Sequence, residues 1–584
     1  MVLFIWEDKF LDMDIHKKAI MKNIPKSICF LLAISFIIRI TIGLVTGAAD
    51  DDAGDYVTYA IQTAHDNDFR NFLDLGLGRQ VFQLWLFCMV CFMKLFGATN
   101  TVATLFTSII GTLNILILFK LVRLFYPQRS SFYISVIYSI VPIIIYTSYN
   151  PCYESIFIFL FLFSVYYYFR FINTNENRFL IISGITGSLL AFINAYGYPV
   201  ILLIVLSFPF IYSGENRFKK WVLFSFFLLL LPLLQMIAWK IIYNSFYPYL
   251  ELLTHWVPDN WTISVSEVVR FLFYCLFSLS FILWTGVILF VFELKGSFNK
   301  IAGLILVVIG ISLFFIFSLR QQKDLFKYFL LIFSILFLIL KRPLIKENGL
   351  IYLFGVMGLI FSLLIIFQFP KRGNPRMFAF IITVLIPVTW FYFEEILKNE
   401  KLVVSFFSSV FGGLLIVGLI LNFTNLKDKE IGFVKGKYSS VLQYNIPFSV
   451  QHKNDRIIVK WLKNNGIIPS DFIIASLKSN RYIPANLDMS QNHFLSAFFF
   501  SYSHKEGFTK ESLENYMKWI NDNNPRFIIW DIDFHEKEYS QIINPNNGER
   551  KIAFDFTDFK DEVSRKYAIK DTIVNRIIVF EPLK

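Results

Sequence analysis

Four aspartates follow directly on the first long apolar run of the sequence, and they are the first residues whose type and spacing could do chemistry. The stretch reads AADDDAGDYVTYA and contains Asp50, Asp51, Asp52 and Asp55. A carboxylate at the rim of a membrane can act as a general base, because the pKa of a carboxyl group rises where water is scarce. A single base of this kind can deprotonate the hydroxyl or amine of an acceptor.

Asp55 is distinguished from the three aspartates before it by the residues on its C-terminal side. There Tyr56, Tyr59, Ala60 and Ala64 recur at helical spacing, which predicts a surface helix that presents Asp55 from its first turn. The alternatives are that the earlier aspartates form a solvated linker and that Asp55 caps the helix. We prefer the linker for those three and keep both interpretations of Asp55 open at this point.

Other polar residues are weaker candidates. His65, His255 and His504 lie far apart without the spacing of metal ligands, so each fits an ordinary surface or rim position. Asp531 and Asp533 end an apolar run, where a turn or strand-end role is a simpler interpretation than catalysis.

The elements that position these residues belong to a membrane protein. Of the 584 residues, 56% are hydrophobic and 17% are charged, which excludes an ordinary soluble chain. Many apolar runs reach the roughly 20 residues that cross a bilayer core of about 30 Å. The polar C-terminal part has no cysteine, so no disulfide framework is predicted, and packing is the preferred role of the CxxC at 88–91. The cysteines are Cys29, Cys88, Cys91, Cys152 and Cys275.

Thirteen transmembrane helices are predicted. Residues 1–26 precede the first one without a cleavage pattern, so they are predicted to be a cytoplasmic segment and not a signal peptide. The run 81–96 is short for a span and is predicted to lie along the membrane surface. The spans lie near residues 27–46, 101–122, 131–149, 154–172, 178–194, 197–213, 219–240, 268–292, 299–318, 326–340, 348–368, 376–396 and 402–422.

The distribution of Lys and Arg sets the predicted orientation. The net charge of +12 would suggest nucleic acid in a soluble protein, but here the cations crowd the loops predicted to be cytoplasmic, so no nucleic-acid binding is expected. The external face then carries the loops 47–100 and 241–267 and everything after Asn422. The basic segments 320–327 and 370–376 also fall outside. An anionic lipid phosphate would account for them, as would imprecise span boundaries or headgroup contacts.

The chain changes character after residue 423. DRIIVKWLKNNG and TKESLENYMKWINDNN have helical patterns, and DFIIASL, RFIIWDIDF and NRIIVF read as short strands. The predicted fold class is therefore mainly α: a polytopic helical membrane domain over 27–423, followed by a small extracytoplasmic α/β domain over 424–584.

The first external loop resembles that of the GT-C superfamily of integral-membrane glycosyltransferases. The nearest branch contains the bacterial aminoarabinose transferase of lipid A and the protein O-mannosyltransferases. That family opens the loop with Asp-Glu-x-Arg-Tyr-Ala, and GDYVTYA places Asp55, Tyr59 and Ala60 at the first, fifth and sixth positions. Tyr56 stands where the family often has a second acid, and Thr58 stands where Arg is usual.

Further motifs come in the order of that family. Arg79 precedes an aromatic-rich juxtamembrane helix. An LFG turn, a basic turn ending in FYPQR and the pair Val141–Pro142 come next. The external turn NPCYES then places Glu154 at a second acidic position. GITGSLLAFINAYGYPVILL resembles the next span of the family. PRMFAFIITVLIP resembles a late segment in which Arg376 begins an outer-facing span. The resemblance is close over 27–213 and loose beyond it.

The resemblance implies a hexosyl- or pentosyltransferase of the plasma (inner) membrane that uses a polyprenyl-phosphate sugar on the outer side. Asp55 is then the base for an envelope acceptor (a lipid, glycan or protein), and Tyr59 belongs to the substrate site. Glu154 orients the acceptor or a metal. The alternative for Glu154 is a helix-start residue favoured by the helix dipole.

The same resemblance gives the basic residues a role at the donor. Arg79, Arg372 and Arg376 stabilise the phosphate leaving group, with Lys371 behind them. The alternative for Arg79 is snorkelling to the interface. Some members use a divalent metal and others do not; carboxylates suit Mg²⁺ or Mn²⁺, and nothing in the sequence requires either.

Two other classes of function stay open. A lipid or polysaccharide transporter or flippase would show paired halves, broken helices and mid-span charges. Here the spans are almost free of charge, with Arg39 as an exception, and the polar groups gather on one face. A membrane-anchored binding module would leave the many spans unexplained.

Overall fold

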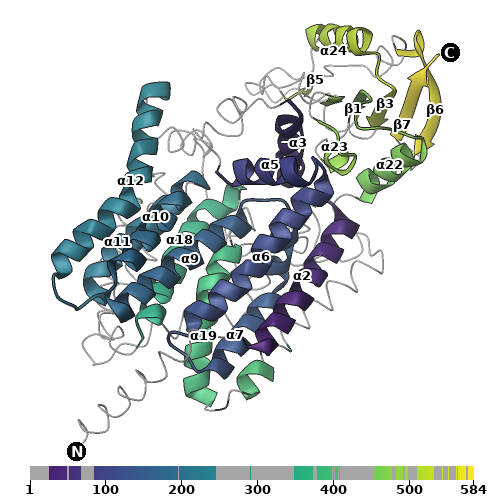
Figure 1. Cartoon of the computed structure of the whole chain (residues 1–584). Coiled ribbons are helices and arrows are strands. Elements are labelled where there is room, and N and C mark those ends of the chain that lie inside the picture. Colours follow the sequence, from purple (N-terminus) through teal and green to yellow (C-terminus); the bar gives the residue numbers. More distant parts are fainter. Residues whose placement is uncertain are drawn as a thin grey trace, which may run out of the picture.

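The protein, described here by a computed structural model, forms a bundle of apolar helices and, beyond residue 452, a small sheet flanked by helices (Figure 1). The predicted domain boundary at 423/424 and nearly all of the predicted spans at 268–292, 299–318, 326–340 and 402–422 lie outside the described residues. Those residues are 25–48, 51–66, 84–194, 196–244, 290, 348–372, 378–397, 399, 401–405, 407, 409, 453–476, 482–490, 493–496, 510–531, 542–543, 550–551, 561, 563–573 and 577–583.

Long apolar segments make up the bundle. Within the described residues, five helices are long and apolar enough to cross a membrane, namely α2, α6, α9, α12 and α19, and a bent pair, α7 and α8, makes up to six. The helices are α2 (Lys26–Thr46), α3 (Asp51–Asp66), α5 (Leu84–Phe96), α6 (Asn100–Val122), α7 (Gln128–Ile140), α8 (Pro142–Tyr149), α9 (Glu154–Thr174), α10 (Asn177–Ser188), η1 (Leu189–Phe192), α11 (Gly197–Ile211), α12 (Arg217–Tyr243), α18 (Gly349–Arg372) and α19 (Phe378–Leu397).

The span predicted over 131–149 is broken in the structure. The chain breaks at Val141, and the axes of α7 and α8 differ by 68°. Pro142 has no amide hydrogen for the helix ladder and pushes the residue before it out of the α region, and Val141 indeed has a ψ of 122°. α8 therefore leads the chain toward the turn before α9 at a new angle.

The predicted spans 178–194 and 197–213 are shorter than expected. The first divides into α10 and the 3₁₀ turn η1, and the second is α11, so each is an apolar helix below the length of a span. Helix α5 has 13 residues and is about 20 Å long, which is less than the bilayer core. It lies across the end of the bundle and packs against α3 and α6 (Figure 1), in the place predicted for a surface helix.

Small residues let the central helices approach closely. Helix α6 packs against both α2 and α8. A Cβ atom added at Gly43 would lie 2.3 Å from Thr104 Cγ2, and one at Gly111 would lie 2.3 Å from Ser148 Cβ. Packing of this kind is what drives helices together in lipid, where the hydrophobic effect does not act between them.

Gly111→Ala is expected to destabilise the bundle by about 1–3 kcal/mol, the usual cost of overpacking a tight core. The new methyl group would also lie 2.9 Å from Ser148 Cα, so the backbone of α8 must move. Thermal unfolding in detergent measures the effect. Gly349→Ala is the matched control, because its Cβ would meet its nearest neighbours at 3.4 and 3.5 Å. Equal unfolding temperatures for the two variants would contradict the prediction.

The C-terminal region contains a mixed sheet with strand order β2-β1-β3-β7-β6. β1 is parallel to β2 and β3, while β7 is antiparallel to β3 and β6. A helix or strand is present at each of the five places predicted here. The elements are α22 (Lys453–Asn464), β1 (Ile473–Ser476), α23 (Tyr482–Asn486), β2 (Phe494–Ser496), α24 (Lys510–Asn523), β3 (Phe527–Asp531), β4 (Ile542–Ile543), β5 (Arg550–Lys551), β6 (Tyr567–Ile573) and β7 (Ile577–Pro582).

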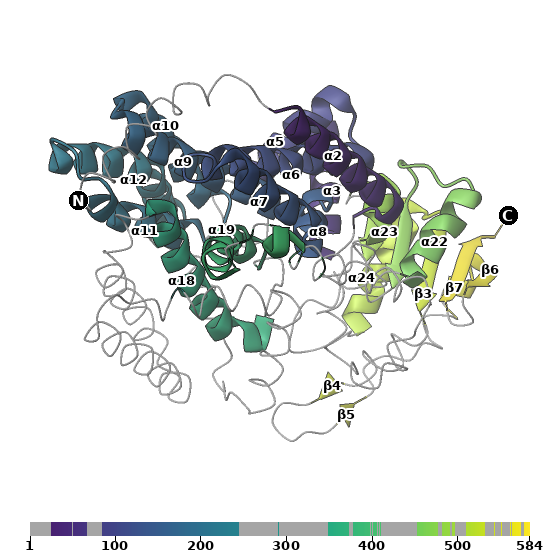
Figure 2. The ribbon, with the colours of Figure 1, turned by 90° about the horizontal axis from the view of Figure 1, so that it is seen from below.

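Both faces of this sheet are covered, which explains the continuous apolar runs of its central strands. Ile473 and Ile529 pack with α22 and α23 on one face. Ile474 and Trp530 pack with Ile520 of α24 on the other. The sheet and its helices lie beside the α2 and α3 side of the bundle (Figure 2), and α23 packs directly against α3.

Candidate active site

Asp55 lies on α3 at one end of the bundle. We call this the α3 end; there α2 ends and α6 and α9 begin. Helix α3 buries Ala53, Val57 and Ile61 along one face. Asp55 is only 7% exposed. The prediction that Asp55 sits in the first turn was wrong, because the helix begins at Asp51 and Asp55 lies one turn later.

The neighbours of Asp55 keep the helix regular. The Thr58 hydroxyl is buried and donates to the carbonyl oxygens of Gly54 at 3.1 Å and Asp55 at 2.9 Å, so it is satisfied within α3. Tyr59 lies one turn beyond Asp55, on the same side of the helix. Its ring is half-buried against the core of the bundle. Asp55 and Tyr59 therefore share one surface of α3.

Glu154 is the first residue of α9 and is 4% exposed. Hydrogen bonds involving α8 and α6 fix the start of α9, where Glu154 lies. The Ser155 hydroxyl donates to the carbonyl of Thr147 on α8 at 2.6 Å, and Asn114 Nδ2 on α6 donates to the Ser155 carbonyl at 2.9 Å. Asn150 Nδ2 also donates to the Tyr146 hydroxyl at 3.2 Å. The break in the span thus ends in a braced turn that holds Glu154 at the α3 end.

A chain of three aromatic rings links the two acidic positions. Tyr56, the residue after Asp55, meets Trp85 of α5 edge-on, with ring centroids 4.5 Å apart. Trp85 in turn meets Tyr153, the residue before Glu154, at 6.3 Å. Trp85 is 1% exposed, so α5 is anchored between α3 and the start of α9. The structure therefore joins the elements that carry Asp55 and Glu154 at one end of the bundle.

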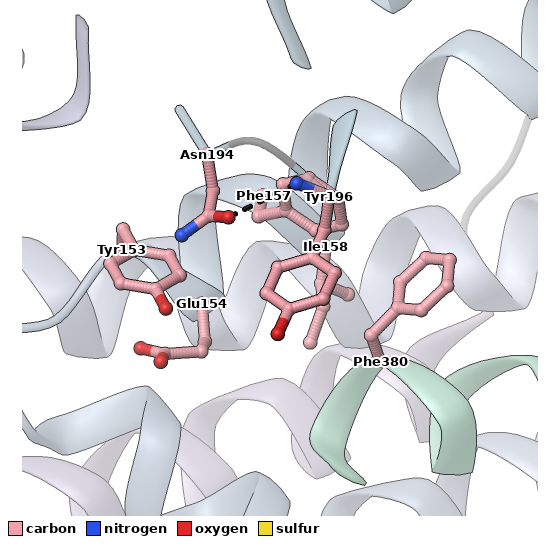
Figure 3. A pocket seen from close by; sticks show the side chains of 7 residues that line it. All are labelled: Tyr153, Glu154, Phe157, Ile158, Asn194, Tyr196 and Phe380. Carbon is pink, nitrogen blue, oxygen red and sulfur yellow. Dashed lines mark hydrogen bonds between the residues drawn. The ribbon is translucent and has the colours of Figure 1, made fainter. Parts of the chain in front are cut away.

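Glu154 lines a narrow pocket at the start of α9. Figure 3 shows the hydroxyl groups of Tyr153 and Tyr196 on the same side of the pocket as the Glu154 carboxylate. The Asn194 side-chain oxygen accepts from the Tyr196 amide at 3.1 Å, and its amide nitrogen is turned toward Tyr153. The pocket is lined by Tyr153, Glu154, Phe157, Ile158, Asn194, Tyr196 and Phe380.

The few polar groups of this pocket could orient the hydroxyl groups of a bound ligand. An ionised carboxylate accepts hydrogen bonds, while phenol and amide groups can donate them. Apolar rings with a few polar groups that fix orientation are typical of small-molecule sites. Phe157 and Phe380 supply two of the rings, with centroids 5.4 Å apart.

Of the predicted basic residues, the structure describes only the backbone of Lys371 and Arg372. Arg79 and Arg376 lie outside the described residues. Lys371 and Arg372 end helix α18, and their side chains also lie outside the description. Helix α19, which comes after this basic segment, begins at Phe378 and contributes Phe380 to the pocket.

Several residues of the site were not singled out in the sequence analysis, among them Trp85, Asn194, Tyr196 and Phe380. Trp85 stood in a segment that was noted only as aromatic-rich. Asn194 and Tyr196 sit where the apolar run breaks between η1 and α11, and a polar residue at such a break was a usable signal. Phe380 carries no signal, because apolar residues surround it in the sequence.

In the described part of the chain, no cluster of side chains supports metal binding. No group of three or more His, Cys, Asp or Glu side chains there could hold an ion. Asp55 and Glu154 supply carboxylate oxygens of the kind that Mg²⁺ prefers. Two carboxylates alone do not define such a site.

Comparison with known proteins gives a match to one family model over part of the chain and a similar fold among solved structures. Residues 84–239 match the family model described as dolichyl-phosphate-mannose-protein mannosyltransferase. The crystal structure of ArnT from Cupriavidus metallidurans bound to undecaprenyl phosphate superposes with a TM-score of 0.53 at 10% identity, over 94% of this chain and 97% of that one. The chain resembles the GT-C membrane glycosyltransferases. The matched segment begins at α5 and includes Glu154, Asn194 and Tyr196.

A second similar structure has a lower score. The archaeal oligosaccharyltransferase AglB from Archaeoglobus fulgidus, in complex with an inhibitory peptide and a dolichol-phosphate, has a TM-score of 0.42 at 14% identity, over 87% of this chain and 69% of that one. No curated protein sequence matches the chain significantly. The likeness to ArnT therefore establishes the GT-C fold, and the recognition made from the motifs is confirmed.

Proposed function

We propose that the protein is a membrane glycosyltransferase that moves a sugar from a polyprenyl-phosphate donor to an envelope acceptor. The observation that carries the proposal is the ring chain Tyr56–Trp85–Tyr153, which brings the elements of the two acids together at one end of a GT-C-like bundle. The family match and the fold of ArnT, whose structure holds undecaprenyl phosphate, support the class of donor.

Asp55 acts as the general base in this proposal. Its carboxylate takes the proton of the acceptor hydroxyl or amine, whose oxygen or nitrogen then bonds to the anomeric carbon of the sugar. The bond from that carbon to the donor phosphate breaks, and its electron pair leaves with the lipid phosphate. A single displacement of this kind inverts the anomeric centre.

The pocket around Glu154 orients the reacting sugar or the acceptor. Its carboxylate and the hydroxyls of Tyr153 and Tyr196 would bind ligand hydroxyl groups. Arg79, Lys371, Arg372 and Arg376 are proposed to stabilise the charge that develops on the leaving phosphate, since fixed cations lower the barrier where charge forms. Tyr59 is proposed to contact substrate beside Asp55.

We place the α3 end on the outer side of the plasma membrane. Cations gather in the turns at the opposite end, which favours the cytoplasm for that end. There Arg170 lies over the Phe179 ring at 4.3 Å, and Arg178 pairs with Glu176 at 2.6 Å. On this orientation the C-terminal domain is extracytoplasmic as well.

Two features of the structure bear on the transporter alternative, and the contacts of Arg39 give one of them a structural role. The broken span α7–α8 and the fully buried Arg39 are both typical of transporters. However, Arg39 Nη1 donates to the Ser35 carbonyl at 3.0 Å and Nη2 lies 3.5 Å from the Ser139 carbonyl, at the end of α7. At the Ser139 carbonyl, a cation stabilises a group at the helix end that the break creates.

Purified protein in vesicles, supplied with radiolabelled polyprenyl-phosphate sugars and a membrane extract as acceptor, is expected to transfer label with release of polyprenyl phosphate. Sugar linked through a diphosphate is the control donor and should be used poorly. Transfer is the result that supports the proposal. Movement of labelled lipid across the vesicle without transfer, for every sugar tried, would overturn it in favour of a transporter.

A further inference from the structure

The C-terminal domain docks onto the helix that carries Asp55. Its short helix α23 packs against α3. Ala485 of α23 is fully buried and belongs to the apolar core of the bundle, although the rest of its domain has separate cores. The two parts of the chain therefore share a core at this point.

Three hydrogen bonds fix the docked position. The Tyr482 hydroxyl donates to the carbonyl of Thr46, the last residue of α2, at 3.0 Å. Asn100 Nδ2 at the start of α6 donates to Asn486 Oδ1 at 3.1 Å. The Asn100 backbone amide donates to Asp488 Oδ1 at 2.7 Å.

Two of these bonds, those to the Thr46 carbonyl and from the Asn100 amide, satisfy backbone groups at a helix end. The last carbonyls of α2 and the first amides of α6 have no partner inside their own helices. The negative charge of Asp488 also suits the positive end of the α6 dipole. The C-terminal domain thus caps both helices that flank the loop bearing α3.

Gly47 marks how closely α23 approaches the start of that loop. Its φ is +67°, which favours glycine, and a Cβ there would lie 1.7 Å from Asn486 Oδ1. Burial raises the pKa of Tyr482, an effect that the nearby Arg456 opposes and Asp455 reinforces. Its hydroxyl therefore stays protonated near neutral pH and remains a donor to Thr46.

We propose that the C-terminal domain holds α3 in its working position through Tyr482, Asn486 and Asp488, which are positioning residues for Asp55. This inference rests on the proposed transferase function for its catalytic consequence. The domain then governs the rate of transfer by placing the base, and not by selecting the acceptor.

Hydrogen exchange tests the positioning without any assay of transfer. In the double variant Tyr482→Phe/Asn486→Ala, amides of residues 51–66 are expected to exchange at least tenfold faster, while those of β1 and β3 keep their protection. The matched control is Tyr567→Phe/Asn523→Ala, which removes the same groups from the far side of the sheet. Unchanged exchange in 51–66, or an equal change in the control, would overturn the inference.

Transfer kinetics then test the consequence for catalysis. Asp488→Ala should lower kcat at least tenfold and leave the KM for donor within twofold, equally for all acceptors. Asp488→Asn should recover most of the rate, because its amide oxygen can still accept from Asn100. A change confined to one acceptor, or no rescue by Asn, would contradict positioning. If the wild type transfers nothing, the proposed function fails, and the exchange experiment alone decides the inference.

Discussion

Asp55→Asn is expected to lower the rate of sugar transfer by about 10²–10⁴-fold, the range that a positioned general base contributes. Asn has nearly the shape of Asp and cannot accept the acceptor proton. Asp55 is almost fully buried on a helix that three other elements hold, α5, α23 and the core of the bundle. The variant should therefore keep its fold and its affinity for donor while losing kcat.

Initial rates with radiolabelled polyprenyl-phosphate sugar, at equal amounts of folded protein, measure this effect. Asp66→Asn is the matched control, because Asp66 is exposed at the end of the same helix. Its rate should stay within twofold of wild type. A similar rate for Asp55→Asn and wild type would move the base elsewhere, with Glu154 as the next candidate.

The sequence predicted well those helices of the bundle that depend only on their own residues. Runs of apolar residues of sufficient length gave α2, α6, α9, α12 and α19 close to their observed bounds, because a helix in lipid must satisfy its own backbone. The break at Val141 was not predicted, although Pro142 was noted in the sequence. Whether a proline kinks or ends a helix depends on partners such as Arg39, which is a hundred residues away in sequence.

Only some residues of the candidate site could be named from the sequence, for a similar reason. Asp55 stood out because a carboxylate is costly beside an apolar run, and Glu154 was named from the resemblance to the family. Their connection through Trp85 could not be predicted, since it depends on how α5 lies across the bundle. The docking of Asp488 on Asn100 was equally hidden, because it joins residues 388 positions apart and neither has an unusual neighbourhood in the sequence.

Glu154→Gln is expected to lower kcat/KM for transfer by about 10–150-fold, which corresponds to the 1.5–3 kcal/mol of a hydrogen bond to a charged group. Gln keeps the volume of Glu, so the packing with Tyr153 and Phe157 should survive. The charge of the carboxylate is lost, and with it the strong hydrogen bonds to ligand hydroxyls. Most of the fall in kcat/KM should come from a higher KM for the ligand that occupies the pocket.

Varying donor and acceptor separately shows which ligand that is. A rise in the KM for acceptor alone would assign the pocket to the acceptor, and a rise for donor would assign it to the transferred sugar. Glu176→Gln is the control at the opposite end of α9, where Glu176 pairs with Arg178 in solvent. If Glu154→Gln changes neither KM nor kcat and only lowers the unfolding temperature, Glu154 is a helix-start residue favoured by the dipole, and the pocket has no part in transfer.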